Sequence, residues 1–211
     1  MNDDIFTQIL LGGILIILMA SLFFVNPVVQ AETIQTNNTN LEEVIFDGAV
    51  VGIAFPHYEI HEGDSFTYGD THIIAKNTQA PDHLIVTPNS TKFAHFTLAI
   101  GSTGGQIMLE VFENATCSDN GDLEPLFNRN RNSNKTPTTI LYEDPTCSST
   151  GTTIFHATYG VDEKKSAGGE GRGTQEWILK ANTKYLVRVT EEDVANTVVN
   201  LEFDWYEHTF S

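Results

Sequence analysis

The C-terminal segment of the chain alternates apolar and polar residues with a period of two. The apolar positions are Val199, Leu201, Phe203 and Trp205, and the polar positions between them are Asn200, Glu202, Asp204 and Tyr206. Successive side chains of a β-strand point to opposite faces, so this pattern indicates an antiparallel strand with one buried face and one polar face. A chain built from such strands must cover their apolar faces with a second layer.

The same period recurs along the chain after about residue 50. Further strands are expected at His83–Thr87, Phe93–Ile100, Gln106–Phe112, Ile140–Tyr142, Thr153–Tyr159 and Thr183–Thr190. A turn at 101–105 joins the second of these to the third, and Trp177–Leu179 is expected to pair with Thr183–Thr190 as a hairpin. About eight to ten strands and no long amphipathic helix after Ala31 predict an all-β fold, an antiparallel two-sheet β-sandwich of jelly-roll-like type.

The N-terminal segment, residues 1–31, is predicted to be a hydrophobic helix, and its most apolar part is residues 9–25. Three interpretations stay open: an export signal cleaved before Glu32, an uncleaved membrane anchor that would make the membrane a partner, and a segment buried in an assembly. No Lys or Arg precedes Lys76, so the positive-inside rule gives no orientation. Residues 32–50 are interpreted as a polar linker and residues 51–211 as the β-sandwich domain.

The charge balance limits the partners of the chain. Its 28 acidic residues outnumber 11 basic ones, which gives a formal net charge of −17. Nucleic-acid binding needs clustered Lys and Arg to neutralise phosphates, so a nucleic-acid partner is not expected.

Cys117 and Cys147 are the only cysteines, and both lie in a similar sequence context, at 115–121 and 145–151. The repetition predicts that both occupy similar strand–turn junctions. In an exported protein the two would form a disulfide, whereas in a reducing compartment they would be free thiols.

The residues that suggest catalysis or metal binding form weak patterns. On a strand, His57, Glu59 and His61 would share one face, but Pro56 opens this run and no HExxH helix motif is present. The segment 119–122 is typical of a turn as well as of a Ca²⁺ loop. No nucleophile elbow is found. We therefore assign no catalytic residue, no metal site and no cofactor.

Two loops carry candidate residues for protein–protein contact. Arg129 and Arg131 are two of only four arginines, and Glu170 and Arg172 lie in a glycine-rich segment at 168–173. That segment lacks the Lys and Ser/Thr of a phosphate-binding loop. In so acidic a chain, the guanidinium groups are expected to pair with carboxylates on neighbouring copies.

Several motifs in order resemble one family. They are the segments 56–63, 87–95, 127–133, 144–151, 168–173, 176–180, 182–186 and 204–208. Over about residues 55–208, the chain resembles virion structural proteins of tailed phages, of the head-decoration or minor capsid type. The resemblance implies a non-enzymatic component of the virion surface, a homo-oligomer that contacts the major capsid protein and copies of itself. The hydrophobic leader and the cysteine pair depart from the family.

Two other function classes stay open. In the first, the chain is a secreted or membrane-anchored cell-surface subunit that forms filaments, and Leu41–Val51 donates a strand to the next subunit. In the second, it is an enzyme or a sugar-binding module on the same fold, with Tyr58, Tyr159 and Tyr206 as the aromatic candidates.

Overall fold

The computed structural model describes residues 41–46, 49–159, 176–192 and 197–209, and all structural statements below concern these residues. The expected hydrophobic helix at 1–31, the first part of the linker, and Glu170 and Arg172 lie outside them. Within the described ranges, no helix has the length and apolar character needed to cross a membrane.

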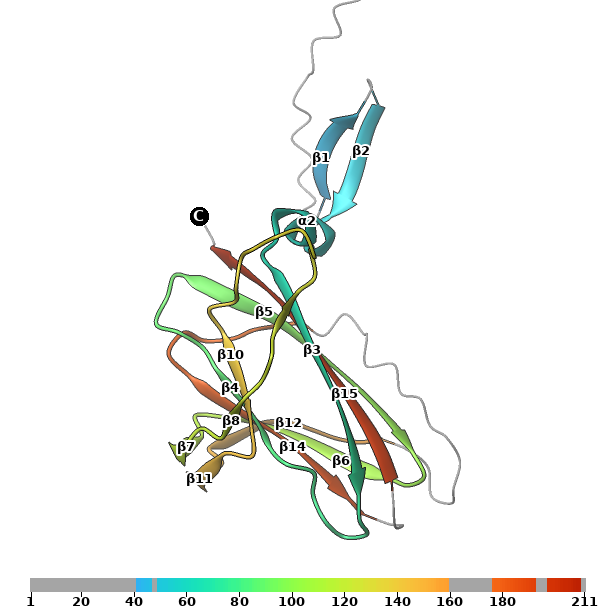
Figure 1. Ribbon diagram of the computed structural model, residues 1–211, viewed down its shortest axis with the longest axis vertical. Helices are drawn as coiled ribbons and strands as arrows, with labels where there is room; N and C mark the ends of the chain where they lie inside the picture. The colour runs from blue at the N-terminus through green and yellow to red at the C-terminus, as the bar shows by residue number, and fades with distance from the viewer. Residues whose placement is uncertain (1–40, 47–48, 160–175, 193–196, 210–211) are drawn as a thin grey trace, which may run out of the picture. The chain divides into compact units, whose positions relative to one another are not determined.

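Two antiparallel sheets make up the body of the fold (Figure 1). The strands of the six-stranded sheet are, in spatial order, β12 (Thr152–Tyr159), β6 (Ile107–Glu113), β14 (Lys184–Glu191), β4 (His83–Val86), β10 (Ile140–Glu143) and β8 (Asp122–Leu123). Those of the five-stranded sheet are β13 (Trp177–Ile178), β5 (Lys92–Thr103), β15 (Thr197–Thr209), β3 (Ser65–Ile74) and β9 (Phe127–Asn128). The prediction of an all-β, two-sheet antiparallel sandwich is confirmed.

The main core lies between the sheets and is built from alternate residues of their strands. On β15, the predicted apolar face is buried, and Phe203 is completely covered. On β14, Tyr185, Val187 and Val189 enter the same core. The period-two pattern therefore identified the inward faces of both strands correctly.

A second, smaller hydrophobic core lies on the outer face of the six-stranded sheet. It consists of Leu84, Phe112, Ala115 and Leu186, and both cysteines pack against it. The cover is a two-stranded sheet of β7 (Thr116–Asp119) and β11 (Thr146–Ser149), joined by the Cys117–Cys147 disulfide. The predicted disulfide is confirmed, and the second core explains why Leu186 is buried although it points away from the main core.

The two cysteine segments are related by a local, approximate two-fold repetition. Asn114 and Asp144 both have positive φ, as do Gly121 and Gly151. A Cβ on Gly121 would collide with the backbone of 143–144, and a Cβ on Gly151 would collide with the backbone of 113–114. Each glycine thus fits against the turn that opens the other segment. The prediction of equivalent strand–turn junctions is confirmed.

The predicted hairpin of Trp177–Leu179 with Thr183–Thr190 is wrong. Strand β13 pairs with β5 in one sheet, whereas β14 lies in the other sheet. The amide of Leu179 donates to the carbonyl of Ala94, so the chain changes sheets at the turn instead of folding back on itself. The predicted turn at 101–105 also connects different sheets, and it starts later because β5 continues to Thr103.

The histidine-containing segment is a helix, α2 (Phe55–Glu62), and not a strand. Pro56 lies in the first turn, where its missing N–H costs no hydrogen bond. Gly63 ends the helix in the left-handed region with φ 77°, and its N–H donates to the carbonyl of Ile60. The proline and the glycine thus define a helix of two turns, too short for a periodicity to reveal.

The last part of the expected linker is a hairpin of β1 (Leu41–Phe46) and β2 (Ala49–Ala54). Its register pairs Leu41 with Ala54 and Phe46 with Ala49. The segment considered as a donor strand is therefore paired within its own chain.

Candidate functional site

The loop that carries Arg129 and Arg131 connects β9 to β10 and is shaped by a buried asparagine. The side-chain amide of Asn128 donates to the carbonyls of Gly63 at 2.7 Å and Lys135 at 3.0 Å. Its Oδ1 accepts the amide of Asn130 at 2.9 Å. One side chain therefore fixes both the start and the end of the loop.

Both arginines of this loop contact groups of their own chain. Nη1 of Arg129 lies 3.8 Å from Oδ2 of Asp204. Nη1 of Arg131 donates to the carbonyl of Asn128, and its guanidinium lies 5.5 Å from the centre of the Phe127 ring. Both residues remain exposed. The structure thus places these two predicted contact residues together, while Glu170 and Arg172 lie outside the described residues.

A buried carboxylate holds the far end of the same loop. Glu207 on β15 accepts hydrogen bonds from the amides of Thr138 and Thr139, from the Thr138 hydroxyl and from the indole N–H of Trp205. Its side chain is almost completely covered. Sequence analysis missed this residue, although the period of two places Glu207 on the same face as Phe203 and Trp205 and so indicated a buried carboxylate.

The outermost strands of both sheets each carry an exposed, large apolar side chain. They are Leu123 on β8, Ile154 on β12, Phe127 on β9 and Ile178 on β13. Ile73 on β3 is the only other residue of this kind among those whose burial is described, and it also lies at a free edge, because β9 pairs only with Phe66 and Thr67 of β3. Edge strands present unpaired backbone N–H and C=O groups, so apolar side chains on them favour contact with another chain.

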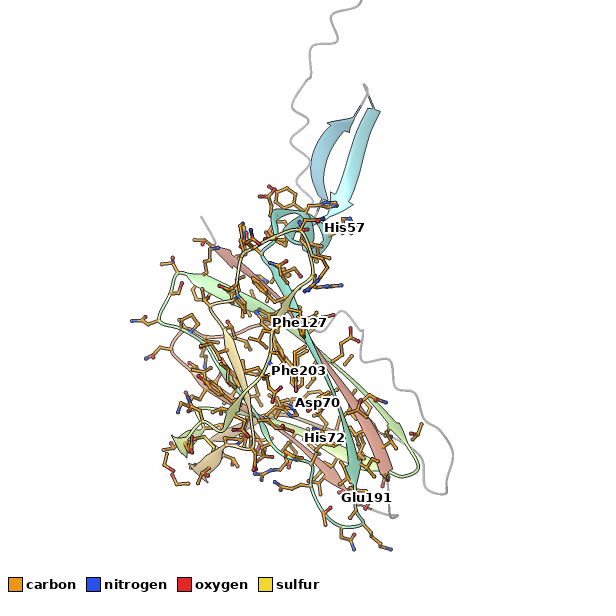
Figure 2. All side chains as sticks on the ribbon, viewed as in Figure 1. His57, Asp70, His72, Phe127, Glu191 and Phe203 are labelled. Carbon is orange, nitrogen blue, oxygen red and sulfur yellow. A yellow bond between two sulfur atoms is a disulfide. The ribbon has the colours of Figure 1, made fainter. Side chains whose placement is uncertain are left out.

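A cluster of polar side chains interrupts the core between the sheets. On β3, the inward positions run Phe66, Tyr68, Asp70, His72, Ile74, so two polar residues follow two aromatic ones. His83 on β4 and Glu143 on β10 have the parity of the core residues Ile85 and Leu141 and therefore face the same space. Figure 2 shows Asp70 and His72 on β3 near the core residue Phe203.

The ligand atoms of this cluster converge within a few ångströms. Oδ2 of Asp70 lies 2.8 Å from Nε2 of His72 and 3.1 Å from Nε2 of His83. Oε1 of Glu143 lies 3.5 Å from Nε2 of His72. One nitrogen or oxygen atom from each of the four side chains lies within 4.8 Å of every other.

Burial and neighbouring charges shift the pKa values of three groups of the cluster. Burial lowers the pKa of His83, although the bond to Asp70 opposes this, so the imidazole favours its neutral form. Burial and the charge of Asp70 raise the pKa of Glu143. Burial would also raise the pKa of Asp70, but the Thr71 amide and the two histidines outweigh it and hold that pKa below its usual value.

Figure 2 shows His57 on α2, away from Asp70 and His72 of the inter-sheet cluster, and His61 lies on the same helix. Both are exposed on α2, and their Nε2 atoms are 3.0 Å apart. Glu59 points elsewhere: it is buried, and its Oε1 lies 3.1 Å from Nδ1 of His208. Burial raises the pKa of Glu59, and the nearby His208 opposes that rise. His57, Glu59 and His61 therefore do not share one face of the helix, although on a strand they would share one face.

The inter-sheet cluster could not be recognised from local spacing. Its four members lie on three strands, and only the pairings of β3, β4 and β10 in the fold bring them together. The one local signal is the pair Asp70 and His72, two residues apart on the inward face of a strand.

The sequence matches no family model, and no curated protein shows significant similarity to it.

Proposed function

We propose that this chain is a virion structural protein, a capsid-decorating or minor surface component that acts through protein–protein contacts. The observation that carries the proposal is the set of exposed apolar side chains on all four outermost strands of the sandwich. Their positions suit side-by-side contact with copies of the chain and with a major capsid protein.

The order of the strands supports a jelly roll. Four neighbours in the five-stranded sheet are β3-β15-β5-β13, and four in the six-stranded sheet are β4-β14-β6-β12. If these eight strands are numbered from one to eight in chain order, strand one lies beside strand eight and strand two lies beside strand seven, as in a jelly roll. The strands from β7 to β11 are then an insertion between its fourth and fifth strands. Jelly rolls form many viral capsid proteins, although lectins and cupins share the fold.

The arginine loop supports contacts of opposite charge. Arg129 and Arg131 are exposed in a chain of net charge −17, so their guanidinium groups can pair with carboxylates of a neighbouring copy. The ring of Phe127 beneath Arg131 adds apolar area to the same surface.

A charge placed on an edge strand tests the proposal. We expect Ile178→Lys to lower the number of copies on purified particles at least about tenfold, because an apolar contact of about 1.5–3 kcal/mol is lost. Arg129→Ala with Arg131→Ala should also lower it, without unfolding the sandwich. Quantitative mass spectrometry of particles measures occupancy, and thermal unfolding measures the fold.

Asn200→Lys is the control. Asn200 is exposed on β15, where it pairs with Thr71 of β3 on one side and with Gly101 of β5 on the other, so its strand has no free edge there. We expect normal occupancy for this variant. Equal occupancy of the edge and control variants would contradict the proposed contacts. Recovery of the wild-type chain only from the host envelope fraction would replace the virion role with that of an exported cell-surface subunit.

A further inference from the structure

We propose that Asp70, His72, His83 and Glu143 bind one divalent transition-metal ion, with Zn²⁺ as the best match, between the two sheets. This inference goes beyond the proposed role on a virion and does not depend on it.

The distances between the ligand atoms fit such an ion. A tetrahedral zinc site with bonds of about 2.0–2.1 Å separates its ligand atoms by about 3.3–3.4 Å. The atoms of Asp70, His72, His83 and Glu143 approach one another at 2.8, 3.1 and 3.5 Å along three of these edges. Small rotations of the side chains would open the shorter distances to those of a tetrahedron.

The ligand types select the class of metal. Two imidazole nitrogens and two carboxylate oxygens suit Zn²⁺ and neighbouring transition metals, whereas Ca²⁺ and Mg²⁺ prefer oxygen ligands throughout. A metal ligand must offer a lone pair, and Nε2 of His72 and Nε2 of His83 lie 2.8 and 3.1 Å from the same oxygen of Asp70, so both can offer one at a shared point.

Two features of the cluster point to a bound cation. Nε2 of His72 is buried and makes no hydrogen bond of proper geometry, although Oδ2 of Asp70 is only 2.8 Å away. A carboxylate oxygen of Asp70 and one of Glu143 also lie within 4.8 Å of each other in this partly buried place. A divalent cation at the shared point would accept the His72 lone pair and offset both negative charges.

Neighbouring groups orient the four ligand side chains and leave one side of the cluster open to a metal ion. Oδ1 of Asp70 accepts the amide of Thr71 at 2.7 Å, which turns Oδ2 toward the histidines. The ring of His83 lies 5.0 Å from that of Phe203 and is fully covered. The side chain of Glu143 is 27% exposed, so an ion can enter from its side.

The site would join the two sheets. Asp70 and His72 belong to the five-stranded sheet, whereas His83 and Glu143 belong to the six-stranded sheet. Bonds to one ion would therefore connect β3 to β4 and β10 across the core, and metal binding should stabilise the fold.

The exposed pair His57 and His61 would complicate a metal titration. Two histidines four residues apart on a helix can chelate a transition metal at the surface, and their Nε2 atoms are already 3.0 Å apart. The full chain with His57→Gln and His61→Gln is therefore the background for the test.

In this background we expect the chelator-treated chain to bind one Zn²⁺, measured by equilibrium dialysis and elemental analysis. At a zinc concentration of about 100 times the Kd, its Tm should rise by about 5–10 °C. Co²⁺ should give the intense visible absorption of a tetrahedral site. Glu143→Gln and His72→Gln should each weaken Zn²⁺ binding at least about tenfold, while the exposed control Glu62→Gln should not.

Absence of zinc binding in this background would overturn the proposal, as would equal binding by the Glu143→Gln variant and the control. If His72→Gln fails to fold, Glu143→Gln decides, because the partly exposed side chain of Glu143 can change without opening the core. Circular dichroism of the metal-free variant establishes that it is folded. All these measurements use the isolated chain, so they are independent of occupancy on particles.

Discussion

Replacement of Cys117 and Cys147 by serine is expected to lower the free energy of unfolding by about 3–4 kcal/mol. The disulfide closes a loop with a sequence separation of 30 residues, and opening it returns that conformational freedom to the unfolded chain. The two sulfur atoms also pack against the small core on the outer face of the six-stranded sheet. Urea unfolding, followed by tryptophan fluorescence, measures the change.

The matched control removes two hydroxyl groups from the same strands and keeps the disulfide. Ser118 and Ser148 each donate to a backbone carbonyl of the opposite strand, at 3.3 and 3.2 Å, and both are exposed. We expect Ser118→Ala with Ser148→Ala to cost less than about 1.5 kcal/mol. A serine-for-cysteine variant as stable as the oxidised wild type would show that the sheet of β7 and β11 is held by its packing alone.

Replacement of Glu207 by alanine is expected to cost about 3–4 kcal/mol. The amides of Thr138 and Thr139 and the indole of Trp205 would lose their charged acceptor in a buried place. The end of the loop from β9 to β10 at Thr138 and Thr139 would also lose its hydrogen bonds to β15. The midpoint of thermal or urea unfolding measures this loss.

Glu207→Gln is the conservative variant for this test. It keeps the shape of the side chain and one acceptor oxygen, so we expect it to recover about half of the loss. Equal destabilisation by both variants would mean that the charge and not the number of acceptors matters. An alanine variant with the wild-type midpoint would contradict the role assigned to Glu207.

The strands were predictable where one face packs on the main core and the other is polar. On β15, alternation identified the buried residues Val199, Leu201, Phe203 and Trp205. Leu186 did not follow this rule, because the disulfide-linked sheet covers the outer face of β14. The pattern along β14 contains no signal for a second cover that comes from β7 and β11, which are distant in the sequence.

The pairing partners of the strands were less predictable than the strands themselves. The turn between β13 and β14 has the length of a hairpin turn, yet the chain crosses to the other sheet there. Burial of Leu179 and its bond to Ala94 decide the direction, and both are long-range contacts. The cluster of Asp70, His72, His83 and Glu143 escaped prediction for the same reason, since its members meet only through tertiary structure.

The reciprocal fit of Gly121 and Gly151 has a consequence for how this region can change during evolution. Each glycine is packed against the backbone of the turn that opens the other segment, so a side chain at either glycine would displace that turn. The two segments, each with its cysteine, are thus expected to be inherited as one unit. Related chains should either retain both segments or have lost both.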